Sequence, residues 1–167
     1  FNTTAKHYFI TANQVEVDAL ERGVFAGWKR SVGGLAVYPV AEDAPAGAVP
    51  VCRFFSSKFT SHFYTADPVE CAGLTARFPH WQFEKIAYQV PLPDAGGHCP
   101  AGNFPVYRMY NNGQGGAPNH RFTTHLPTVV DFVSNRGWVS EGSGAIGVAM
   151  CSPQTAILGD ARGYWLG

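Results

Sequence analysis

The sequence is poor in charge and contains no long apolar run. Only 14% of its 167 residues are charged, and twelve Lys and Arg balance twelve Asp and Glu. Such a sparse and balanced charge argues against nucleic acid or an anionic membrane as partner. No stretch approaches the roughly 18 to 20 apolar residues of a membrane-spanning helix, and the opening FNTT does not resemble a signal peptide. We expect a mature or excised fragment that folds as one ordinary domain.

Motifs of enzymes and metal sites are missing as well. The sequence has no H-E-x-x-H, C-x-x-C or G-x-S-x-G, and the glycine-rich stretch NNGQGGAPNH (111–120) lacks the Lys and Ser/Thr of a phosphate loop. The sequence does not exclude the paired carboxylates of a glycosidase, but no Asp or Glu recurs in an evident acid–base context. We therefore expect no catalytic residue, no metal and no other cofactor.

One pattern occurs three times along the chain. The segments KHYFITANQVEVDAL (6–20), SHFYTADPVEC (61–71) and NHRFTTHLPTVVDFV (119–133) each place a His, an aromatic residue and a Thr before a helix-like run. A catalytic centre occurs once in a chain whereas a structural unit recurs, so the pattern indicates a repeated fold element. A tryptophan follows each shared Thr at a nearly constant distance and begins an alternating, strand-like stretch, as Trp28, Trp81 and Trp138.

Each motif is expected to lie between strands and a helix. The stretches VPVCRFFSS (49–57) and FPVYRMYNN (104–112) precede the second and third motifs and alternate as strands do. Asp67 followed by Pro68 is typical of a helix start, and Gly23 is typical of a helix end. We predict an α+β fold, mostly β, of three strand-strand-helix-strand repeats in a compact pseudo-threefold arrangement.

These repeats define one domain over residues 1–153, with boundaries at about 1–44, 49–93 and 99–152. The first repeat begins at FNTT and lacks its leading strand. The tail, 154–167, matches no part of the pattern. One hypothesis is that TAILG (155–159) supplies the missing strand and closes the tail onto the first repeat.

The four cysteines are predicted to form two disulfides. An even count without zinc-ligand spacing favours disulfides over free buried thiols, and it indicates an oxidising compartment, so the protein is expected to be secreted or at the cell surface. Four cysteines allow three pairings. Because Cys52 and Cys71 belong to one repeat, we predict a bond between them, which leaves Cys99 to bond Cys151 across the third repeat.

Arg53 and Arg108 occupy the same place in an otherwise apolar strand of their repeats. A charge there is costly unless it is paired, so we predict structural ion pairs. Glu84 and Glu141, three residues after the repeat tryptophan, are the expected partners. The alternative is that the arginines point into ligand clefts between repeats.

The three repeat tryptophans have two interpretations. Packing in the core, with all three mostly buried, is favoured because a Trp at the start of a buried strand fills space between helix and sheet. The alternative is a platform on which the apolar face of a sugar ring stacks while neighbouring polar side chains bind its hydroxyl groups.

The quoted segments resemble a family of tandem repeats of uncharacterised function. VPVCRFFSSKFTSHFYTADPVECAGL and CPAGNFPVYRMYNNGQGGAPNHRFTT are similar to its pattern of V-Y-R-F-x-N, then H-F-Y-T, then G-W-x-x-E-G. The resemblance covers residues 1 to about 153, although HYFIT in the first repeat has one more residue than HFYT. It implies a C-terminal accessory module of a secreted or surface protein of bacteria or fungi, often attached to a hydrolase or protease.

A repeated, aromatic-rich and weakly charged surface favours a non-catalytic extracellular binding module. The expected ligand is a glycan or other extracellular polymer, bound in a lectin-like way or to target a parent enzyme to substrate through several weak sites. A protein-interaction or adhesin module is the alternative, and a hydrolase is the second alternative.

The turn-rich tips at 56–61 and 111–119 are predicted to form the binding face, because such tips present polar groups without disturbing the core. Alanine at Tyr64 or Asn119 is accordingly expected to weaken binding with little change in melting temperature. The candidate ligand-binding residues are His62, Tyr64, Asn112, Asn119, His120, Arg53 and Arg108.

Overall fold

A computed structural model describes residues 1–31, 34–40, 44–154 and 163–165, the last three as backbone only. The fold is α+β with more strand than helix, as predicted. Its helices are α1 (Gln14–Glu21), α2 (Pro68–Arg77) and α3 (Leu126–Arg136), with a short 3-10 turn at Gln114–Gly116. Its strands are β1 (Gly34–Ala36), β2 (Ala48–Ser56), β3 (Ser61–Thr65), β4 (Gln82–Pro91), β5 (Asn103–Tyr110), β6 (His120–Thr123), β7 (Val139–Glu141), β8 (Val148–Pro153) and β9 (Gly163–Trp165).

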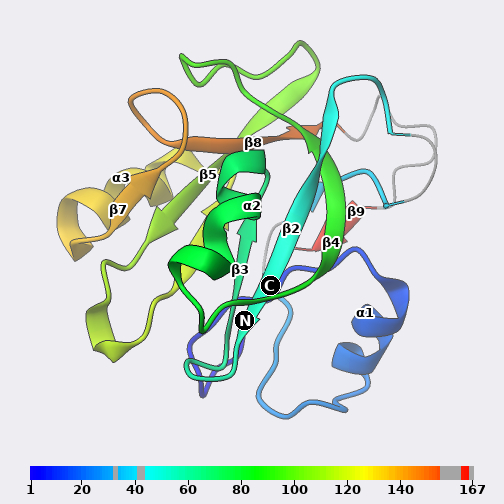
Figure 1. Cartoon of the computed structure of the whole chain (residues 1–167), viewed down its shortest axis with the longest axis vertical. Coiled ribbons are helices and arrows are strands. Elements are labelled where there is room, and N and C mark those ends of the chain that lie inside the picture. Colours follow the sequence, from blue (N-terminus) through cyan, green and yellow to red (C-terminus); the bar gives the residue numbers. More distant parts are fainter. Residues whose placement is uncertain (32–33, 41–43, 155–162, 166–167) are drawn as a thin grey trace.

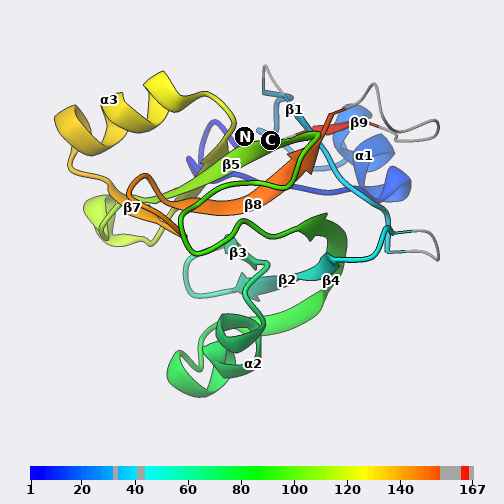
Figure 2. The ribbon, with the colours of Figure 1, turned by 90° about the horizontal axis from the view of Figure 1, so that it is seen from above.

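Two antiparallel sheets form the body of the molecule. In one, β2 lies between β3 and β4; in the other, β5 pairs with β6 on one side and with β7 and β8 on the other. Residues 48–91 and 103–153 therefore share the predicted order of strand, strand, helix and returning strand. The three helices lie at separate positions on the outside of the strands (Figures 1 and 2).

The returning strand of the last segment is split into β7 and β8 by a glycine-rich loop. Gly142 has φ 133°, and a Cβ on it would lie 2.6 Å from the carbonyl oxygen of Val148. Only glycine fits this close approach, which explains the EGSGAIG stretch as a structural turn.

The first segment differs from the other two. Its described residues contain α1, β1 and an isolated bridge between Asn2 and Trp28, but no regular strand before the helix. The tail strand β9 pairs antiparallel with β1, with Tyr164 opposite Leu35. The strand hypothesised at 155–159 lies outside the described residues.

The shared threonine of the motif holds the turn from strand to helix. The hydroxyl groups of Thr11, Thr65 and Thr123 each accept a hydrogen bond from the backbone N–H two residues later, at 3.0, 3.0 and 3.1 Å. That later residue is the helix N-cap in each case. This local bond gives a physical reason for the repeated Thr.

The predicted helix signals are confirmed. Asp67 caps α2 by accepting from the N–H groups of Val69 (2.7 Å) and Glu70 (3.1 Å), and Pro68 occupies the first turn. Gly23 has φ 72° directly after the C-cap of α1, the left-handed geometry that ends helices.

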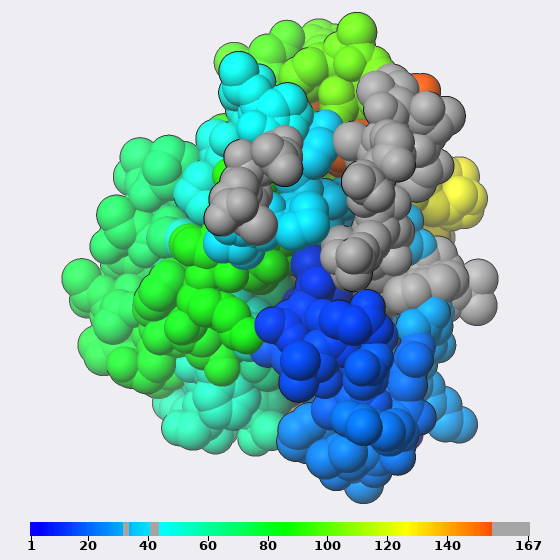
Figure 3. Space-filling model, turned by 90° about the vertical axis from the view of Figure 1, so that its right-hand side faces the viewer, coloured from blue at the N-terminus to red at the C-terminus, as the bar shows by residue number. Residues whose placement is uncertain are grey.

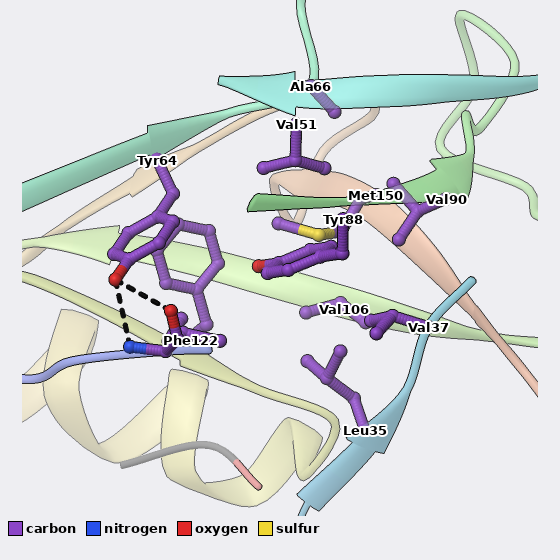
Figure 4. Close-up of a cluster of buried hydrophobic side chains, with 11 residues drawn as sticks. Leu35, Val37, Val51, Tyr64, Ala66, Tyr88, Val90, Val106, Phe122 and Met150 are labelled. Carbon is purple, nitrogen blue, oxygen red and sulfur yellow. Dashed lines mark hydrogen bonds between the residues drawn. The ribbon is translucent and has the colours of Figure 1, made fainter. Parts of the chain in front are cut away.

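The main core collects side chains from all three segments. The residue before each shared Thr enters it, as Ile10, Tyr64 and Phe122. The Tyr64 hydroxyl group donates to the carbonyl oxygen of Ile10 at 2.8 Å and accepts from its N–H at 2.9 Å (Figure 4). Strand residues complete the cluster, among them Leu35, Val51, Tyr88, Val106 and Met150 (Figure 4).

Both predicted disulfides are present. Cys52–Cys71 joins β2 to α2, and Cys99–Cys151 joins the segment before β5 to β8. Two disulfides fit an extracellular protein. No helix in the described part of the chain is long and apolar enough to cross a membrane.

Two replacements of Tyr64 should destabilise the protein to different degrees. Tyr64→Phe leaves the Ile10 N–H and C=O without their partner and should lower the free energy of unfolding by about 1–3 kcal/mol. Tyr64→Ala also empties the core and should lower it by about 3–5 kcal/mol. Urea denaturation measures both changes. Phe104→Ala, at a position 52% exposed, is the control and should change stability by only about 0.5 kcal/mol; a tolerated Tyr64→Ala would contradict the core placement.

Removing the disulfides should have unequal effects. Cys52–Cys71 closes a span of 19 residues and Cys99–Cys151 one of 52, which correspond to about 3 and about 4 kcal/mol of stabilisation from restriction of the unfolded chain. Paired Cys→Ser variants, compared by thermal unfolding, should therefore rank in that order. Non-reducing peptide mapping checks the connectivity, and a Cys52 to Cys99 linkage would contradict it.

Candidate ligand-binding site

Each arginine at the shared strand position of the second and third segments lies between two glutamates. Arg53 donates from Nε to Glu84 at 2.8 Å and from its terminal nitrogens to Glu16 at 2.9 and 3.0 Å. It is 5% exposed. The predicted pairing of Arg53 with Glu84 is confirmed, and its guanidinium has no edge left for a ligand.

Arg108 repeats this geometry one segment later. It donates to Glu70 at 2.8 and 3.3 Å, and its Nε forms an ion pair with Glu141 at 2.9 Å. The predicted partner Glu141 is therefore confirmed. We call these two arrangements the arginine clasps: Arg53 with Glu16 and Glu84, and Arg108 with Glu70 and Glu141.

The helix glutamates were missed by the sequence analysis. Glu16 and Glu70 each come from the helix of the preceding segment, so each clasp joins one segment to the next. Both stand three residues after the helix N-cap, Asn13 or Asp67. That shared spacing was visible in the sequence, but nothing local indicates that its partner lies in the following repeat.

An aromatic ring lies under each clasp. The guanidinium carbon of Arg53 is 4.9 Å from the centre of the Phe9 ring, and that of Arg108 is 5.2 Å from Phe63. Each ring also meets a histidine of the next segment edge-on at 4.8 Å, His62 for Phe9 and His120 for Phe63. The clasps therefore combine ion pairs with cation–π contacts.

Burial and charge shift the titration of these groups. Burial tends to raise the pKa of Glu16, but hydrogen bonds from Arg53, Lys85 and Thr11 outweigh it and lower that pKa to about 2. Burial, helped by the charge of Arg53, lowers the pKa of His62 to about 4. Burial also lowers the pKa of His120, against the opposing effect of Glu141. Both histidines are therefore neutral near pH 7.

The structure does not gather the predicted ligand-binding residues on one face. His62 and His120 lie 3.4 and 3.3 Å from Glu84 and Glu141, inside the clasps. Asn119 donates from its side chain to the carbonyl oxygen of Lys6 at 2.7 Å, which ties it to the first segment. Of the two tip asparagines, only Asn112 is exposed.

The placement of Tyr64 on the binding face is wrong. Tyr64 is 2% exposed and its hydroxyl group is occupied by Ile10. The tip at 111–119 is organised instead by Asn111, which donates to the carbonyl oxygens of Gln114 and Ala117 and accepts from the N–H of Gly113 and Asn119. The polar groups of Asn111 therefore stabilise the turn.

Two cavities with related walls lie beside the helices. One, of about 320 Å³, is lined by Phe9, Leu20 and Trp28, with Phe1, Thr11, Val17, Glu21, Lys29 and Arg30 around them. The other, of about 370 Å³, is lined by Phe63, Leu74 and Trp81, with Phe59, Glu70, Phe78, His80, Tyr110, Pro118, His120 and Glu141. We call these the first and second tryptophan pockets.

The walls of the two pockets match position by position. Phe9 and Phe63 stand two residues before the shared Thr, and Leu20 and Leu74 stand nine after it. The Phe and Trp rings are 5.8 Å apart at 66° in the first pocket and 5.9 Å apart at 54° in the second. The same aromatic wall is thus built twice.

The third segment has other residues at these places. Arg121 and Phe132 occupy the positions of Phe63 and Leu74. The Arg121 guanidinium lies 4.7 Å from the Phe132 ring, which packs edge-on against Trp138 at 5.0 Å. The Arg121 side chain also lies 5.6 Å from the ring of Tyr8, so it reaches the first segment.

The tryptophans differ in burial. Trp81 is buried, as predicted, while Trp28 and Trp138 are only partly buried.

A further, more polar cavity of about 420 Å³ lies between the start of α2 and the β7–β8 loop, where Arg108 and Glu70 contribute to its lining. Among the described residues no group of three or more His, Cys, Asp or Glu could hold a metal ion.

The features above define a disulfide-bonded α+β domain in which consecutive segments are joined by buried arginines. The chain belongs to the family described as Domain of unknown function (DUF5648), whose sequence model matches residues 1–148. This agrees with the resemblance to an uncharacterised family. No curated protein and no solved structure matches the chain.

Acid should weaken the clasps in two stages. The unfolded chain takes up a proton at His62 below about pH 6.5 but the folded chain does so only near pH 4, so stability should fall as pH falls through this range, by up to about 1.4 kcal/mol per pH unit. Glu16 adds a second loss between its ordinary pKa of 4.5 and about 2.

Urea denaturation at pH 7.5, 5.0 and 3.0 measures both losses. His62→Gln should flatten the dependence between pH 6.5 and 4, whereas His98→Gln, at a side chain that is 81% exposed, is the control and should leave it unchanged. Equal pH profiles for His62→Gln and the parent protein would contradict the first stage.

Proposed function

We propose that this domain is a non-catalytic extracellular binding module for glycans and that the two tryptophan pockets are its binding sites. The carrying observation is the duplicated wall of Phe9, Leu20 and Trp28 in one pocket and of Phe63, Leu74 and Trp81 in the other. A core position needs no cavity beside it, so a repeated cavity lined by aromatic rings supports ligand binding.

The lining chemistry suits a sugar. An aromatic ring offers a flat apolar surface to the C–H face of a pyranose, while hydroxyl groups need polar partners around it. In the second pocket Glu70, His80, His120 and Glu141 supply such partners. In the first, Thr11, Glu21, Lys29 and Arg30 do so. Volumes of about 320 and 370 Å³ accommodate one small ring system each.

Two weak sites on one module raise the affinity for a polymer. A glycan chain that engages both pockets converts the second binding event into an intramolecular one. This property suits an accessory module that holds a secreted parent protein or enzyme near an insoluble substrate. The two disulfides and the absence of enzyme motifs in the sequence support an extracellular, non-catalytic role.

We further propose that residues 1–44, 49–93 and 99–152 are three repeats around a pseudo-threefold axis. Ile10, Tyr64 and Phe122, at one motif position, all enter the main core. The arginine clasps link the first repeat to the second and the second to the third. Arg121 over the Tyr8 ring links the third back to the first. Figure 3 displays the first segment (blue) against the second (green). Lys85 of the second segment forms an ion pair with Glu16 of the first.

A protein-interaction or adhesin module is the alternative function, because exposed apolar side chains also recognise peptides. Phe25, Phe78 and Val69 are 55%, 43% and 80% exposed. The duplicated pocket favours the glycan, since a repeating polymer matches a repeating site. A hydrolase is the second alternative, tested by broad hydrolase assays on the isolated domain.

Binding should depend on the aromatic rim of the second pocket. Phe78→Ala removes a lining ring that is 43% exposed and should weaken binding of the best polysaccharide from a glycan array about threefold to tenfold, the effect of losing one aromatic contact. Isothermal titration calorimetry measures the change. Phe83→Ala, 53% exposed and outside both pocket linings, is the matched control and should bind as the parent does.

Two results would overturn the proposed function. One is a glycan array with no ligand above background. The other is a bound glycan whose affinity is unchanged by Phe78→Ala and also by Trp28→Phe in the first pocket. Selective binding of a peptide ligand in the same pockets would support the protein-interaction alternative instead.

A further inference from the structure

We propose that β9, which pairs with β1, is the leading strand of the first repeat, so that a strand from the tail completes that repeat. This proposal rests on the repeat arrangement proposed above, but not on the ligand. Figure 2 shows β9 beside β1, far along the chain from it.

The register of β9 matches that of the leading strands in the other two repeats. Tyr88 pairs with Val51, and Met150 pairs with Val106. Leu35 pairs with Tyr164. Leu35 and Tyr88 both stand seven residues after the repeat tryptophan, and Leu35, Tyr88 and Met150 all belong to the main core. Tyr164 therefore holds the register position of Val51 and Val106.

The neighbouring residue pair in each of these strand pairings also occupies an equivalent position. Pro50 lies opposite Gln89, and Pro105 opposite Cys151. Gly163 lies opposite Ala36 in the same place. A proline has no N–H, so this register position cannot donate to the neighbouring strand in β2 or β5.

The backbone N–H of Gly163 likewise has no partner to donate to on β1, because the backbone groups of Ala36 bond on the other side of that strand. The N–H of Ala36 donates to Ser152 Oγ at 2.9 Å, and Ser152 Oγ donates back to the Ala36 carbonyl oxygen at 3.0 Å. Gln89 likewise exchanges both backbone bonds with Tyr38. Ala36 and Gln89 thus turn their polar backbone groups away from the leading strand.

Backbone groups alternate along a strand, so those of Leu35 turn toward β9. Leu35 is only 4% exposed. Without β9, no other described strand pairs with its N–H and C=O groups. The Leu35 backbone therefore requires a partner strand, and Tyr164 stands opposite it.

The test uses two proline variants of the full chain. Gly163→Pro reproduces the residue found at this position in β2 and β5 and should preserve the pairing. Tyr164→Pro removes an N–H that points at β1 and should break it. Residue-resolved amide hydrogen exchange reads the result, because the Leu35 amide should exchange at least about tenfold faster in Tyr164→Pro than in the parent protein.

The Ala36 amide is an internal control, since its partner is Ser152 Oγ rather than β9. It should stay protected in both variants, and Gly163→Pro should leave Leu35 protected as well. Equal exchange at Leu35 in the parent and in Tyr164→Pro, or equal loss in both variants, would overturn the proposal.

One further measurement distinguishes β9 of the same chain from β9 of a second copy. Another distinguishes the strand assignment from the proposed glycan binding. Light scattering should show a monomer, whereas a concentration-dependent dimer that Tyr164→Pro abolishes would assign the strand to a second copy and overturn closure within one chain. Glycan binding at the second tryptophan pocket should be unchanged in Gly163→Pro. A failure of glycan binding in every variant and the parent would remove the proposed ligand and leave the strand assignment standing.

Discussion

The structure depends on two largely shielded guanidinium groups, 5% exposed in Arg53 and 11% in Arg108, each held between a carboxylate of its own segment and a carboxylate of the segment before it. The forked geometry of arginine allows this, because its paired terminal nitrogens bind one carboxylate while Nε faces another. Removing the arginine leaves two neighbouring carboxylates without their shared partner, which is strongly destabilising. The helices need these bonds, since α1 buries no side chain and α2 buries only Leu74. Glu16 therefore contributes much of the docking of α1, whereas α2 is held by Glu70 together with the Cys52–Cys71 disulfide.

The clasps also set the shape of the proposed binding sites. Phe9 and Phe63 each form one wall of a tryptophan pocket and lie under the guanidinium of the following segment. Each ring is therefore held in place by an arginine contact, and little side-chain freedom is lost when a ligand stacks on it. In the third segment Arg121 stands where these rings stand and extends to Tyr8. In the third segment this position therefore contacts the first segment instead of forming a pocket wall.

Much of this architecture could be predicted from particular residues. Asp67 and Gly23 marked helix ends through local chemistry, and the spacing of Glu84 and Glu141 from the repeat tryptophans identified them as arginine partners. The disulfides followed from assigning cysteines to repeats. Tyr64 was misplaced because it follows a turn-rich tip, whereas its strand β3 is covered on both faces: Phe63 packs with Trp81 and Tyr64 enters the main core. Alternation cannot identify the exposed face when a strand is covered on both sides. The tail strand hypothesised at 155–159 lies outside the described residues, and the described pairing with β1 is made by β9. The GYW stretch of β9 is too short for an alternating strand pattern.

The pairing of β1 with β9 bears on how the chain folds as it is synthesised. The second segment contains Cys52 and Cys71 and all of its own strands, so it can complete its sheet and its disulfide soon after residue 91 emerges. The first segment precedes the second in the sequence, but its outer strand β9 follows the third segment. Closure of so large a loop is slow compared with local pairing. The first segment is therefore expected to complete its sheet after the second, although it comes before it in the sequence.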